Sequence, residues 1–131
     1  MNNSKKIIAV DFDGTLCKYN FPKIGKQSKY QKELMEILIR MKKSGHKIIL
    51  WTNRGDNKEY PVLTQALDWC KENGLEFDAV NSNIKGQKKL SGHSPKIMAD
   101  YYIDDKALQF KSKESMKLVL EFLKELEIKN A

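Results

Sequence analysis

Two aspartates follow an apolar run near the start of the chain, in the stretch Ile7–Thr15, which reads IIAVDFDGT. Asp11 and Asp13 are two residues apart, so both side chains would leave the same face of an extended strand, and a turn at Gly14 lets the chain gather them. Carboxylates held this close repel each other unless a cation or a shared proton intervenes. The arrangement favours a hard metal ion such as magnesium, although a strand end followed by an ordinary Asp-Gly turn has the same pattern.

Two later apolar runs, KIILW at 47–51 and YYI at 101–103, also end abruptly in polar residues. Thr52, Asn53 and Arg54 follow the first run, and Asp104 and Asp105 follow the second. Each group alone fits a strand-end cap or a solvated turn. The recurrence of the pattern at three strand ends is what indicates a shared site.

Between these runs the pattern alternates strands with helices. Apolar spacing predicts helices over 28–43, from Tyr60 or Pro61 to Asn73-Gly74, and from about Ser112 onward. Strands are expected over 6–10, 47–51, 77–80 and 101–103. The alternation predicts an α/β fold, a Rossmann-like three-layer sandwich with a mainly parallel sheet, right-handed crossovers and helices on both faces. Such sheets bind ligands at the carboxyl ends of their strands, where the polar groups would meet.

The chain of 131 residues fits one domain over 1–131, since 40% of its residues are hydrophobic and no linker divides it. No stretch is long and apolar enough to span a bilayer, and the polar start MNNSKK lacks the apolar core of a signal peptide. Cys17 and Cys70 are too few for a disulfide framework and are expected to be reduced, while Trp51 and Trp69 are expected in the core. A cytoplasmic protein with no membrane partner is expected, and the sequence leaves its oligomeric state open.

The formal charge of +7 comes from 22 lysines and two arginines against 17 acidic residues. This excess favours anionic partners, either nucleic acid or a phosphorylated substrate. Lysines scattered along a chain more often form a solvated surface than a binding footprint, because specific readers of nucleic acid usually cluster arginine and aromatic residues as well.

The ordered motifs resemble the haloacid dehalogenase superfamily, whose members are largely phosphohydrolases and phosphotransferases with a Rossmann-like fold. The resemblance rests on Asp11-Phe12-Asp13-Gly14-Thr15 as the first motif, Thr52 as the second, Lys96 as the third and Asp104-Asp105 as the fourth. Four matches in the right order are far more specific than one. The chain is similar to small capless members, because 16–27 has room only for a flap and 81–95 only for a loop. We therefore expect no separate cap domain and an open site.

The resemblance implies a magnesium-dependent phosphatase that works through an aspartyl-phosphate. Asp11 would be the nucleophile and Asp13 the general acid and base. Magnesium would be bound by Asp11, the main-chain carbonyl of Asp13, Asp104 and, directly or through water, Asp105. The phosphate would be bound by Thr52, Lys96, the backbone N–H groups around Phe12 to Gly14 and of Asn53, with Thr15 as a further candidate. Arg54 would either contact the substrate or pair with an acidic surface residue.

The substrate implied is a phosphorylated small molecule or a macromolecular phosphate ester, with a nucleotide or a nucleic-acid end among the candidates. Two other classes of protein share part of this pattern. A signalling receiver domain also gathers carboxylates around magnesium, but it carries its phosphorylated aspartate after the third strand and its lysine after the last, which is not the order found here. A non-catalytic module that binds nucleic acid or phosphate on the same fold remains the alternative function.

Overall fold

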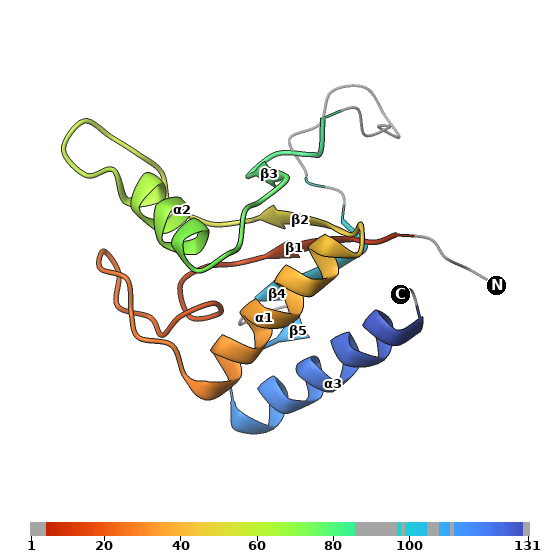
Figure 1. The fold of residues 1–131 in the computed structure, drawn as a ribbon. Coiled ribbons are helices and arrows are strands. Elements are labelled where there is room, and N and C mark those ends of the chain that lie inside the picture. Colours follow the sequence, from red (N-terminus) through yellow and green to blue (C-terminus); the bar gives the residue numbers. More distant parts are fainter. Residues whose placement is uncertain (1–4, 86–96, 98, 105–107, 111, 130–131) are drawn as a thin grey trace.

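The computed structural model describes residues 5–85, 97, 99–104, 108–110 and 112–129. These residues form a five-stranded sheet in the order β3-β2-β1-β4-β5, in which every pairing is parallel, and three helices (Figure 1). The elements in chain order are β1 (Ile7–Val10), α1 (Lys29–Lys43), β2 (Lys47–Leu50), α2 (Val62–Glu72), β3 (Ala79–Val80), β4 (Tyr101–Asp104), β5 (Leu108–Gln109) and α3 (Lys113–Lys129). The predicted α/β class with a parallel sheet is confirmed.

The order of the strands reverses direction at β1. The chain adds β2 and β3 on one side of β1 and then returns to add β4 on its other side. Val10 at the end of β1 pairs with Leu50 of β2 and with Ile103 of β4, so the three strands end at the same level. The carboxyl ends of strands next to such a reversal form a crevice in open α/β sheets, and this position is where ligands bind.

The two faces of the sheet are covered differently. Ile8 and Val10 belong to the large apolar cluster that includes residues of all three helices, whereas Ala9 and Ile49 pack with Ile97 on the opposite face. Helices were expected on both faces, but every described helix lies on one. A right-handed connection from β3 back to β4 must cross the opposite face, and the described residues of that connection form no helix.

Sequence patterns located the helix starts and the ends of the four predicted strands to within two residues. α1 begins directly after Ser28, as expected, and α2 and α3 begin within two residues of the predicted positions. β5 was not predicted, because a strand of two residues carries no periodic signal. Trp51, expected in the core, is 40% exposed because β2 already ends at Leu50.

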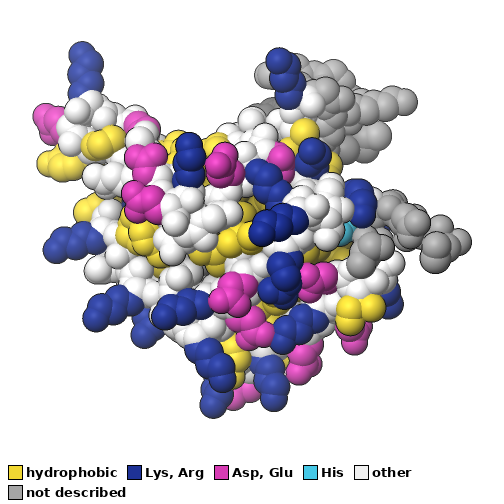
Figure 2. Space-filling view, viewed as in Figure 1, with side chains coloured by type: hydrophobic (Ala, Val, Ile, Leu, Met, Phe, Trp, Pro, Cys, Tyr) yellow, Lys and Arg dark blue, Asp and Glu magenta, His cyan; other side chains and the backbone are white. Residues whose placement is uncertain are grey.

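Charged side chains are spread over the molecule. In the view of Figure 2, lysines and arginines alternate with acidic side chains across the face that carries α1 and α3, and they do not gather in one patch. Two ion pairs on this face join the helices, Arg40 with Glu127 and Lys124 with Glu33. No helix in the described part of the chain is long and apolar enough to cross a membrane.

The start of α1 is fixed by a reciprocal pair of hydrogen bonds. The Ser28 hydroxyl accepts from the Gln31 N–H at 3.2 Å, and the Gln31 side chain accepts from the Ser28 N–H at 2.8 Å. We expect Ser28→Ala to lower the free energy of unfolding by about 1 kcal/mol, as measured by urea denaturation, because an N–H of the first turn loses its partner. Ser44→Ala, at the exposed C-cap of the same helix, is the control and should change stability far less.

His46 is 1% exposed, and its Nδ1 accepts a hydrogen bond from the Lys6 N–H at 3.0 Å. Burial lowers the pKa of His46, and the positive charges of Lys5 and Lys6 lower it further, against a smaller opposing effect of Glu127. The neutral imidazole is therefore the form that the folded chain favours.

As the pH falls below about 6.5, histidine in the unfolded chain takes up a proton before His46 does in the folded chain, so stability should decline. In His46→Asn, whose amide oxygen can replace Nδ1 as acceptor, the decline in denaturation midpoint between pH 6.5 and pH 5 should be shallower. His93→Asn changes the only other histidine and serves as the control. Equal slopes in wild type and His46→Asn would contradict this assignment.

Candidate active site

A pocket of about 270 Å³ opens at the carboxyl ends of β1 and β2. Its lining residues are Asp11, Asp13, Tyr19, Phe21, Thr52, Asn53 and Arg54. Five of these were candidates from the sequence, and they come from two segments about forty residues apart in the chain. Adjacent parallel strands bring them together because β1 and β2 end side by side.

The first aspartate is held at the point where β1 stops. The Asp11 N–H donates to the Ile103 carbonyl of β4 at 2.9 Å, which extends the pairing of the strands by one residue. The Asp11 carboxylate accepts from the Phe12 N–H at 2.7 Å. These two bonds fix the backbone and the carboxylate of the predicted nucleophile.

Beyond Asp11 the chain curls, as the Asp-Gly pattern predicted. Gly14 has a φ of +82°, a left-handed conformation that favours glycine, and its N–H donates to the Cys17 carbonyl at 2.9 Å. The Phe12 carbonyl accepts from the Leu16 N–H at 2.9 Å and closes the turn. Two of the amides expected to bind phosphate, those of Phe12 and Gly14, are therefore already hydrogen-bonded within the protein.

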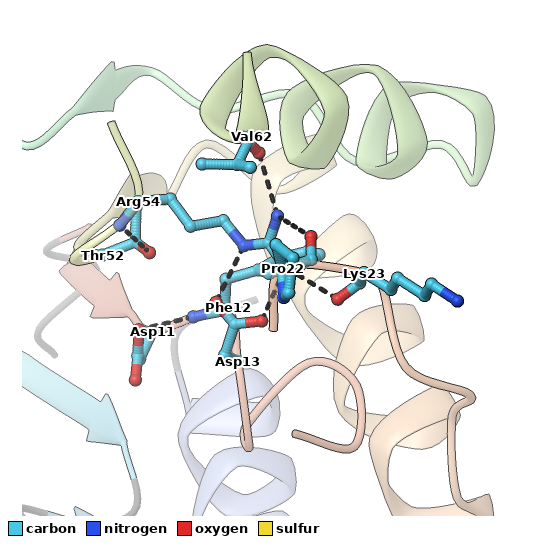
Figure 3. A network of polar contacts seen from close by, with 8 residues as sticks. All are labelled: Asp11, Phe12, Asp13, Pro22, Lys23, Thr52, Arg54 and Val62. Carbon is cyan, nitrogen blue, oxygen red and sulfur yellow. Dashed lines mark hydrogen bonds and ion pairs between the residues drawn. The ribbon is translucent and has the colours of Figure 1, made fainter. Parts of the chain in front are cut away.

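Arg54 forms a bidentate ion pair with Asp13. Its Nε donates to one carboxylate oxygen and its Nη2 to the other, each at 2.8 Å (Figure 3). The remaining guanidinium N–H groups donate to the carbonyls of Val62 at 3.0 Å, Lys23 at 3.0 Å and Pro22 at 3.3 Å. Arg54 is 2% exposed, and the hydrogen bonds to Asp13 raise its pKa.

These contacts revise the role predicted for Arg54. A guanidinium has five N–H groups, and all five of those of Arg54 donate to protein oxygens, so none remains for a phosphate. Arg54 does pair with an acidic residue, but the partner is Asp13 of the site and not the surface residue expected as the alternative. Arg54 therefore positions Asp13 and the loop that carries Pro22 and Lys23.

Thr52 is oriented by two hydrogen bonds. Its N–H donates to the Asn81 side-chain oxygen at 2.8 Å, and its hydroxyl oxygen accepts from the Arg54 N–H at 3.1 Å. A hydroxyl that accepts in this way keeps its proton for donation to a ligand. Asn81, which has a left-handed φ of 50°, was not singled out from the sequence, where it belongs to a polar stretch after β3.

The predicted metal ligands lie on adjacent strands. Asp11 follows Val10 and Asp104 follows Ile103, and Val10 pairs with Ile103, so the two aspartates stand side by side at the end of the sheet. Carboxylate and carbonyl oxygens are the donors that magnesium prefers, so the residues present fit this ion. The described residues contain no group of three or more His, Cys, Asp or Glu side chains arranged to hold a metal. Asp105 and Lys96 lie outside the described residues.

Thr15, the last residue of the first motif, and Cys17 are buried and do not line the pocket, so the predicted contact of Thr15 with the phosphate is not supported. Thr15 is fully buried, and its hydroxyl has no hydrogen-bond partner within the described ranges. Burial raises the pKa of the Cys17 thiol to about 11, so this cysteine is protonated at neutral pH. A nucleophilic role for Cys17 is thus disfavoured.

Comparisons with known proteins agree with the geometry. Residues 8–129 match the family model of the haloacid dehalogenase-like hydrolases, so the chain belongs to this family. A solved structure of a conserved protein from Bacteroides thetaiotaomicron is similar, with 32% sequence identity and a TM-score of 0.72. The similarity covers 94% of this chain and 93% of that one. No curated protein matches the chain significantly.

The ion pair between Arg54 and Asp13 should contribute strongly to stability. We expect Arg54→Met to lower the free energy of unfolding by about 3 kcal/mol or more, because it leaves the Asp13 carboxylate and three carbonyls without their donor. Urea denaturation would measure this loss. Arg40→Met is the matched control: it removes the only other arginine, whose pair with Glu127 is half exposed, and should cost about 1 kcal/mol or less. Similar losses in the two variants would contradict the central role of Arg54.

Proposed function

We propose that this hydrolase is a phosphatase that transfers a phosphoryl group to Asp11 and then to water. The observation that supports this most directly is the arrangement of two carboxylates and a hydroxyl around one pocket. Asp11 and Asp13 follow β1, and Thr52 follows the neighbouring β2. This set provides a nucleophile, a proton-transfer group and a phosphate-binding hydroxyl.

In the first step an oxygen of the Asp11 carboxylate attacks phosphorus, and the bond from phosphorus to the leaving oxygen breaks. Asp13 would give the leaving oxygen a proton, which requires Asp13 to be protonated and to release at least one of its two hydrogen bonds from Arg54 when the substrate binds. In the second step a water molecule attacks the aspartyl-phosphate, Asp13 takes its proton, and the Asp11 carboxylate and inorganic phosphate are released. Splitting one displacement in two lowers the barrier of each part.

The phosphate is bound by groups that stay in place between the two steps. The Thr52 hydroxyl is oriented by Arg54 N–H and donates to a phosphate oxygen. Asn53 lines the same pocket and offers its backbone N–H. Lys96 remains proposed as the side chain that balances the charge of the phosphate, by its match to the family's third motif.

Magnesium is the proposed cofactor. Asp11, the main-chain carbonyl of Asp13, Asp104 and Asp105 would hold it, and the bound ion reduces the repulsion between the anionic nucleophile and the anionic substrate. The proposed compartment is the cytoplasm, with which the two buried free thiols, Cys17 and Cys70, are compatible.

Substitution of the nucleophile tests the proposal. With p-nitrophenyl phosphate and magnesium, Asp11→Asn should lower kcat by at least about a thousandfold, since the amide cannot form the acyl-phosphate. Asp68→Asn, an exposed aspartate of α2, is the control and should retain wild-type turnover. Chelation with EDTA should abolish wild-type activity, and added magnesium should restore it.

Undiminished turnover in Asp11→Asn would exclude Asp11 as the nucleophile. If the wild type hydrolyses no phosphate ester but binds oligonucleotides with a steep dependence on salt, the alternative of a non-catalytic binding module would be favoured instead.

A further inference from the structure

Two aromatic side chains line the pocket and are also open to water. Tyr19 is 73% exposed and Phe21 is 46% exposed, and both come from the loop between β1 and α1. When a ligand covers large rings that were exposed to water, the removal of their apolar surface from water lowers the free energy of the complex. The proposed phosphatase chemistry makes no use of these rings, so they are available for the part of the substrate that bears the phosphate.

Tyr19 and Phe21 form an aromatic wall, and Arg54 holds the Phe21 side of this wall in place. Besides pairing with Asp13, it donates to the carbonyls of Pro22 and Lys23, and its guanidinium carbon lies 5.2 Å from the centre of the Phe21 ring. Preorganisation lowers the entropic cost of binding, because the Phe21 ring needs little ordering when a ligand arrives.

The base of the same loop is also closed. The Lys18 N–H donates to the Lys26 carbonyl at 2.8 Å. Gly25 packs so tightly that an added Cβ would lie 1.9 Å from the Lys18 carbonyl oxygen. The two ends of the loop, at Lys18 and at Gly25–Lys26, therefore lie in close contact. This contact limits the movement of the segment between them, which carries Tyr19 and Phe21.

Charge on the loop indicates what kind of ring fits. Residues 16–30 include four lysines and no aspartate or glutamate. Lys18, Lys23 and Lys26 are all exposed, so the loop that carries Tyr19 and Phe21 has a positive charge that no acidic residue of the loop offsets. Aromatic side chains combined with lysines suit a ligand with both a flat ring and negative charge, as a nucleotide has.

We propose that Tyr19 and Phe21 form a stacking subsite for the base of a nucleotide whose phosphate is bound beside Asp11 and Thr52. The nucleotide is either free or at the end of an oligonucleotide. This inference rests on the proposed phosphatase function and specifies its substrate class. The pocket of about 270 Å³ is at the small end for ligand sites, so it holds the phosphate while the base rests on the exposed rings at its edge.

The test compares substrates that share one leaving oxygen. In adenosine 5′-monophosphate and in ribose 5-phosphate the leaving group is the same, the primary 5-oxygen of the ribose. A difference in kcat/KM between the two substrates therefore reports binding of the base. Wild-type enzyme with magnesium should prefer adenosine 5′-monophosphate by about tenfold or more, from stacking on the aromatic rings. A 5′-phosphorylated tetranucleotide, assayed in parallel, distinguishes the end of a chain from the free nucleotide.

Tyr19→Leu and Phe21→Leu keep an apolar side chain but remove the ring, and each should reduce this preference several-fold, mainly through KM. Because the preference is a ratio measured on one preparation, partial unfolding of a variant does not alter it. Tyr60→Leu is the matched control, since Tyr60 is 61% exposed but is not among the lining residues, and it should retain the wild-type ratio.

A wild-type ratio near one, or ratios unchanged in both loop variants, would overturn the subsite. Preference for phosphotyrosine over adenosine 5′-monophosphate, reduced in the same variants, would also overturn it in favour of a peptide ligand. If activity depends on Asp11 but shows no preference for the base, only this inference fails. If no ester is hydrolysed, the proposed function fails as well.

Discussion

The buried ion pair between Arg54 and Asp13 joins four segments of the chain at the carboxyl end of the sheet. Asp13 belongs to the turn after β1, and Arg54 belongs to the loop after β2. Lys23 lies in the loop before α1, and Val62 is the first residue of α2. Asp56 also joins the loop after β2 to the start of α2, because its carboxylate accepts from the Leu63 and Thr64 N–H groups. The Arg54 guanidinium joins all four segments, since its five N–H groups lie in one plane and reach oxygens in different directions.

Burial removes the hydration of both charges, so a buried ion pair is stable only if hydrogen bonds within the protein replace the lost contacts with water. Both oxygens of the Asp13 carboxylate accept from Arg54, and the Phe12 ring, fully buried, lies 4.9 Å from the guanidinium carbon. The ring face attracts the cation while excluding water. Lysine could not replace arginine here, since an ammonium has three donors on one atom and could not hold a bidentate carboxylate and three carbonyls together. The same contacts that orient a predicted catalytic aspartate therefore also place the aromatic wall of the pocket.

The sheet provides the second constraint. β1 is buried between two parallel neighbours, so its end can only lead outward, into the crevice created where the strand order reverses. Asp11 and Thr52 are remote in the chain but adjacent in space, as this topology requires, and Asp104 stands next to Asp11 on the other side. Lysines on the face drawn in Figure 2 contribute to the charge of +7 without forming a single basic patch, and residues 16–30, which include Tyr19, add four lysines and no acidic residue.

Local patterns in the sequence were sufficient to predict the class of fold, the three helices, the turn at Gly14 and the strand ends that carry Asp11 and Thr52. These features depend on periodicity, capping and backbone conformation, which neighbouring residues determine. The partner of Arg54, the orienting role of Asn81, the exposure of Trp51 and the aromatic wall could not be derived in this way. Each depends on which distant segments meet and how closely their side chains pack, and the geometry of a buried hydrogen-bond network is set only when the sheet and its loops have assembled.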